Sequence, residues 1–92
     1  MEFEFEFEEE AWEELVRLRD DSEHQHIYRA IWEVILQLEV DPGDPKLGTR
    51  TFAGIEDIGF ARTTPVRKVD WVIVWHLDDT QPVVAYIKNV AG

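Results

Sequence analysis

The sequence contains no cysteine, which excludes disulfides, thiolate metal sites and cysteine nucleophiles. It also has no apolar run long enough to cross a membrane, for which a helix needs about 20 residues. The longest such run extends only from Trp71 to Trp75. The first residues are acidic and lack the basic and apolar regions of a signal peptide. These absences favour a cytoplasmic protein with no membrane segment.

Basic residues are scarce, with nine Lys and Arg against twenty Asp and Glu, and the formal net charge is −11. The first half, residues 1–45, has fifteen acidic residues and three Arg, a balance of −12. The second half, residues 46–92, has six basic and five acidic residues, a balance of +1. Because a strongly negative field repels nucleic acid at long range, any RNA binding is expected to be local to the second half.

The length of 92 residues and a hydrophobic content of 45% predict one domain, residues 1–92, with a single core. The opening residues 2–7 alternate strictly between Glu and Phe, which is typical of a half-buried strand. We expect Phe3, Phe5 and Phe7 to face the core and the intervening Glu side chains to face water or a sheet edge. The regular repetition is also what an engineered N-terminus would show.

The period changes at Glu8, after which Ala11, Leu15 and Leu18 fall at helical spacing. Ser22 followed by Gln25 fits a capping box and predicts that a second helix begins there. The segment DPGDPKLGT at 41–49 ends the helical region. Because the connection between the two helices is short, we expect an antiparallel helical hairpin.

Strand patterns follow at roughly 58–66, 70–76 and 82–90, with turns at 67–70 and 78–81. The predicted fold class is therefore α+β, with the order β-α-α-β-β-β. It has two layers, in which the helical hairpin packs on a four-stranded, mostly antiparallel sheet. The run from Trp71 to Trp75 is apolar on both faces of its strand, so we expect a partner or a second copy of the chain to cover the face that the helices leave open.

This order, carried by EAWEELVRL, IYRAIWEVILQLEVDP, GFARTTPV, VDWVIVWHLDD and TQPVVAYI, resembles the RelE/ParE superfamily of bacterial toxins from toxin–antitoxin pairs. The resemblance implies that the chain binds a cognate antitoxin. It also implies that the chain cleaves mRNA at the ribosome, if it is active, or belongs with the gyrase-directed branch, which lacks the ribonuclease residues.

Cleavage of RNA by its own 2′-hydroxyl needs a group to take the proton, a cation to stabilise the phosphorane and an acid for the leaving oxygen. The resemblance matches Arg62 to an Arg of the family's second strand, whereas Val72 stands where a basic residue is frequent. His76, placed by alternation on the open sheet face, is a candidate general acid or base or simply a solvent-facing side chain. The candidate phosphate-binding and RNA-binding groups are Lys46, Arg50, Arg67, Lys68 and Lys88.

No metal or cofactor is expected. His24 and His26 are two residues apart and cannot share one helix face, and Asp41 and Asp44 fit a turn better than a calcium loop. The thin catalytic set and the acidity favour an alternative function, a non-catalytic acidic binding module. Such a module would resemble an inhibitor or antitoxin and bind a basic partner, or it would be an engineered fold relative without activity.

Overall fold

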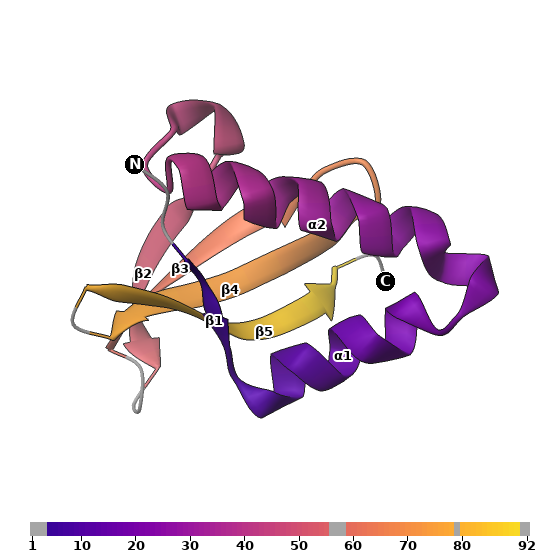
Figure 1. Ribbon diagram of the computed structural model, residues 1–92. Coiled ribbons are helices and arrows are strands. Elements are labelled where there is room, and N and C mark those ends of the chain that lie inside the picture. Colours follow the sequence, from indigo (N-terminus) through magenta and orange to yellow (C-terminus); the bar gives the residue numbers. More distant parts are fainter. Residues whose placement is uncertain (1–3, 56–58, 79, 91–92) are drawn as a thin grey trace.

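The computed structural model describes residues 4–55, 59–78 and 80–90 (Figure 1). Its two helices and five strands follow one another along the chain with two single 3-10 turns, at Ser22–His24 and Pro45–Leu47. The elements are β1 (Glu6–Phe7), α1 (Glu9–Arg19), α2 (Gln25–Val40), β2 (Arg50–Ile55), β3 (Gly59–Val66), β4 (Trp71–Asp78) and β5 (Gln81–Asn89).

The strands form one sheet in the order β1-β5-β4-β3-β2. β1 runs parallel to β5, and the other neighbouring strands are antiparallel. The helices form the second layer (Figure 1), so the predicted α+β class, the helical hairpin and the order β-α-α-β-β-β are confirmed.

The predicted number of four strands is wrong, because the sheet has five. The additional strand is β2, in a segment whose sequence, RTFAGI, shows no clear alternation of apolar and polar residues. β2 pairs antiparallel with β3, with Arg50 opposite Thr63 and Thr51 opposite Arg62. This long-range pairing, rather than a local pattern, makes the segment a strand.

The opening alternation places Phe5 and Phe7 against the core, as predicted, while Phe3 lies outside the described residues. Phe5 is 8% exposed, and its ring meets the Trp75 ring edge-on at a centroid distance of 5.3 Å. Glu6 is exposed and pairs with Val83, and Phe7 pairs with Val84. The backbone N–H of Phe5, just before this short strand, donates to Glu39 Oε2 on α2 at 3.3 Å.

The core lies between the two layers and is built from one face of each helix and the facing side of the sheet. Trp71, Ile73 and Trp75 alternate along β4 toward the helices. The other buried residues of this cluster on helices and strands are Ala11, Leu15, Leu18, Ile27, Ala30, Ile31, Ile35, Leu38, Val66, Val84 and Ile87. Neither described helix has the length and apolar character needed to cross a membrane.

Asp21, not Ser22, caps the turn between the helices, so the predicted capping box is wrong. The carboxylate of Asp21 accepts from the backbone N–H of Glu23 at 3.0 Å and lies 2.6 Å from His24 Nδ1. Gln25 instead donates through Nε2 to the carbonyls of Arg19 and Asp21. The bond from Glu23, followed by that from His24, lowers the pKa of Asp21. The stabilisation by this cap is therefore present at neutral pH and is lost as the pH falls through the lowered pKa of Asp21.

Candidate binding site

The two predicted catalytic residues lie on opposite faces of the sheet. Arg62 is the cross-strand partner of Trp75, and its guanidinium carbon stands 5.3 Å from the centroid of the Trp75 ring on the helix side. His76 is the next residue along β4 and pairs with Val83, so strand alternation turns it toward the other face. Arg62 and His76 therefore do not form one catalytic site.

Two of the predicted phosphate-binding residues also face away from the helices. Arg50 pairs with Thr63, the neighbour of Arg62 along β3, and alternation places it on the face opposite Arg62. Lys88 pairs with Val72, and its Nζ atom stands 4.8 Å from the centroid of the Tyr86 ring. Arg50 and Lys88 therefore cannot act on the same ligand group as Arg62.

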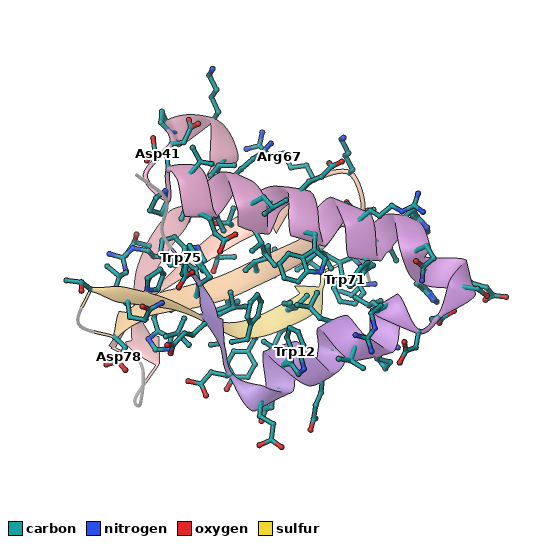
Figure 2. The ribbon with its side chains drawn as sticks, viewed as in Figure 1. Trp12, Asp41, Arg67, Trp71, Trp75 and Asp78 are labelled. Atoms are coloured by element: carbon teal, nitrogen blue, oxygen red, sulfur yellow. The ribbon has the colours of Figure 1, made fainter. Side chains whose placement is uncertain are left out.

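The other three predicted residues, Lys46, Arg67 and Lys68, do come together. They line a cleft of about 180 Å³ between α2 and the turn that joins β3 to β4. Figure 2 shows Arg67 beside α2. Lys68 Nζ lies 3.6 Å from Glu33 Oε2, but both side chains are exposed, so this ion pair is weak. The cleft is thus a local basic site on an acidic protein.

The segment 41–49 borders two cavities: Lys46 and Leu47 line the basic cleft, and Pro42 and Gly43 line a second cavity together with Arg62. The hydroxyl oxygen of Thr49 lies 2.7 Å from that of the fully buried Thr64, and the indole N–H of Trp75 donates to Thr64 Oγ1 at 2.9 Å. Asp41 and Asp44 accept the backbone N–H groups of Gly43 and Lys46, as expected for turns. The contact between Thr49 and Thr64 joins the segment to the sheet, and the bond from Trp75 to Thr64 holds the indole ring in place.

Beside the start of segment 41–49, Arg62 lines a hollow of about 390 Å³. Its walls come mostly from apolar side chains, including Pro42, Trp75, Leu77 and Pro82. Arg62 is half-buried and forms no ion pair within the described part of the chain. We call this site, a guanidinium over an indole ring in an apolar hollow, the Arg62 hollow.

The chemistry of the Arg62 hollow suits an anionic group that is attached to an apolar group. A guanidinium binds a carboxylate or phosphate through two parallel N–H donors, and stacking on an aromatic ring fixes its plane. The apolar walls exclude water from one side, which strengthens such a bond. The sequence identified Arg62 and missed the walls, because Pro42, Leu77 and Pro82 carry no chemical signal of their own.

Gly48 fixes the end of segment 41–49, with φ +70° in the left-handed region. A Cβ atom at this position would clash with Arg67 Nη2. We predict that Gly48→Ala lowers the free energy of unfolding by about 1–2 kcal/mol, because alanine is strained in this conformation, and that it displaces Arg67. Urea denaturation measures the change. Gly43→Ala is the control, since a Cβ there meets only Asp41 Oδ1 at 3.6 Å, and an equal loss in both variants would contradict the prediction.

No family model matches the chain, and no curated protein matches it. Among solved structures, the chain is similar to the solution structure of the conserved hypothetical protein HP0894 from Helicobacter pylori. The two chains share 17% identity with a TM-score of 0.57, and the match covers 98% of this chain and 96% of that one. At this identity the likeness shows a shared fold over nearly the whole chain.

Proposed function

We propose that this chain is a RelE/ParE-like toxin-family domain that works by binding a polypeptide of the antitoxin type, which it holds through acidic and apolar side chains. The observation that carries the proposal is the Arg62 hollow. In a chain with twenty acidic residues, the half-buried guanidinium of Arg62 has no Asp or Glu partner within the described residues. A ligand carboxylate would supply that partner, while Trp75 and Leu77 bury the apolar side chain beside it.

The basic cleft supplies a second anchor for the same ligand. Arg62 and Arg67 are five positions apart along β3 and the turn that follows, which corresponds to about 16 Å of extended chain. An extended segment with two acidic residues about five positions apart would reach both anchors. Such a ligand would be attracted by the local positive charge of this surface, although the protein as a whole is acidic.

Cleavage of mRNA, the enzymatic activity implied by the family resemblance, has weaker support. Of the three groups that the reaction needs, the Arg62 hollow supplies the cation, and His76 faces the other side of the sheet. We therefore expect purified protein to leave mRNA on ribosomes intact and its expression to cause no growth arrest. Cleavage that disappears in Arg62→Ala would show that the protein is a nuclease and overturn this part of the proposal.

The binding proposal is tested with a fluorescein-labelled peptide that carries two Glu about five positions apart, each next to a Leu. We expect it to bind, and we expect Arg62→Ala to weaken binding at least about tenfold, since the variant removes the charged partner of a partly buried carboxylate. Arg62→Lys should recover only part of the loss, because an ammonium group lacks the planar fork. Fluorescence anisotropy measures all three affinities.

Two controls accompany this measurement. Arg29→Ala removes an exposed cation from α2, outside both anchors, and should bind the peptide as the parent does. A peptide with Gln in place of both Glu should bind at least about tenfold more weakly than the acidic one. Equal binding of the two peptides, or an unchanged affinity in Arg62→Ala, would show that the Arg62 hollow is not the binding site.

A further inference from the structure

The two helices meet at residues 20–24 and diverge from there toward β1 (Figure 1). Aromatic rings lie where they diverge. The ring of Phe7 is 5.7 Å from that of Trp12 on α1 and 5.8 Å from that of Trp32 on α2, and the rings of Tyr28 and Trp32 are 6.4 Å apart. This cluster joins β1, α1 and α2, and Figure 2 shows the position of Trp12 within it.

The outer side of the cluster is open to solvent. Trp12 is 48% exposed, and Leu36, one helical turn after Trp32 on α2, is 56% exposed. A notch of about 10 Å³ between Trp12, Val16, Tyr28 and Trp32 marks the join of the helices. The surface is therefore shallow, and a partner would lie across it. We call Trp12, Val16, Tyr28, Trp32 and Leu36 the helical groove.

The rim of the helical groove beside Trp12 is acidic. Glu8 and Glu9 lie one turn before Trp12, at the N-cap and first residue of α1, and Glu13 lies one turn before Val16; all three are exposed. None of them forms an ion pair in the part of the chain that the structure describes. The nearest cations in the sequence are Arg17, which pairs with Glu14, and Arg19, which pairs with Asp20 and also lines the notch. Three acidic side chains against Arg19 leave this rim with a net negative charge.

We infer that the helical groove binds a basic amphipathic helix from a protein partner. The apolar face of that helix would cover Trp12, Trp32 and Leu36, and its Lys or Arg side chains would lie against Glu8, Glu9 and Glu13. A second copy of this chain fits poorly, because a two-fold interface through the same surface would bring two acidic rims together. The inference is independent of the proposed function, since the helical groove shares no residue with the Arg62 hollow.

The test uses three synthetic peptides of about 18 residues, which is about five helical turns. The first has Leu on one helical face and Lys on the other, the second has the same composition in an order that destroys the apolar face, and the third has Glu in place of Lys. Calorimetric titration of the folded protein should show binding of the first peptide and binding at least about tenfold weaker for the other two. Added salt should weaken binding of the first peptide.

Three variants locate the binding surface. Trp12→Ala should weaken binding of the first peptide at least about tenfold, and Glu9→Gln combined with Glu13→Gln should weaken it several-fold. Val90→Ser removes an apolar side chain of similar exposure, 58%, outside the helical groove and should leave the affinity unchanged. Circular dichroism establishes that each variant is folded. Leu36→Ser, at an exposed position that folding does not require, gives a second measure of the apolar contact.

Several results would overturn the inference. Equal binding of the first two peptides would mean that charge alone attracts them. Binding of the Glu peptide as tight as that of the Lys peptide would remove the role of the acidic rim. An unchanged affinity in both Trp12→Ala and Leu36→Ser would place the binding surface elsewhere, and self-association that Trp12→Ala abolishes would identify a second copy of the chain as the occupant.

Discussion

Replacing Trp75 by alanine is expected to lower the free energy of unfolding by about 3–5 kcal/mol, the usual cost of removing a large buried aromatic side chain. Trp75 is 2% exposed, packs against the Phe5 ring, supports Arg62 and donates its indole N–H to Thr64. A domain of 92 residues has a total stability of about 5–14 kcal/mol, so the loss is a large fraction of the whole. Urea denaturation followed by circular dichroism measures it.

Trp12→Ala is the matched control, because it deletes the same atoms from a side chain that is 48% exposed. We expect this variant to lose about 1 kcal/mol, mostly from the edge contact between Trp12 and Phe7. Trp75→Phe should fall between the two, since it keeps the contact with Phe5 but leaves Thr64 Oγ1 without the indole donor. Similar losses in Trp75→Ala and Trp12→Ala would mean that Trp75 does not occupy the core.

Phe5→Glu is expected to unfold the domain or to cost about 4 kcal/mol or more, because it places a carboxylate among the apolar side chains of the core. Phe5 is 8% exposed against Trp75 in the core. Phe5→Leu should cost only about 1 kcal/mol, since it keeps most of the apolar volume. Thermal and urea unfolding of the variants provide the comparison.

The control for Phe5→Glu is the next residue along the chain. Glu6→Gln changes an exposed side chain on the solvent side of β1 and should alter the free energy of unfolding by less than about 0.5 kcal/mol. If Phe5→Glu were as stable as Glu6→Gln, the alternation of the first residues would not direct phenylalanine into the core.

Periodicity predicted the layers of this fold because each element presents a regular apolar face. Leu15 and Leu18 on α1, and Ile31, Ile35 and Leu38 on α2, are all buried at helical spacing. The strand β2 was not predicted because its extended conformation depends on pairing with β3. The cap of the 3-10 turn was not predicted because both Asp21 and its neighbour Ser22 can accept a hydrogen bond from the backbone there, and Asp21 does so. Local patterns therefore predicted the apolar face of each helix. The boundaries of the elements and the number of strands depended instead on competing polar groups and on long-range pairing.

Part of the candidate site could also be predicted from the sequence. Once the turn at 67–70 pairs Val66 with Trp71, counting along both strands places Arg62 opposite Trp75. The position of segment 41–49 against the sheet could not be predicted from the sequence, because it depends on a contact between Thr49 and Thr64, which are fifteen positions apart. The placement of Arg62 apart from Arg67 and Lys68 could not be predicted either, because it depends on which cavity each side chain lines. The coverage of the open sheet face by another chain stays a prediction.

The parallel pairing of β1 with β5 has a consequence for the way the chain reaches its native state. Gln81 bonds to the Glu4 carbonyl across 77 positions, and Phe7 pairs with Val84. Nearly the whole polypeptide must be available before β1 can pair with β5, which raises the contact order and slows folding. A nascent or truncated chain that stops before Gln81 would leave β1 without its strand partner, so that its apolar side would be open to aggregation or to chaperones.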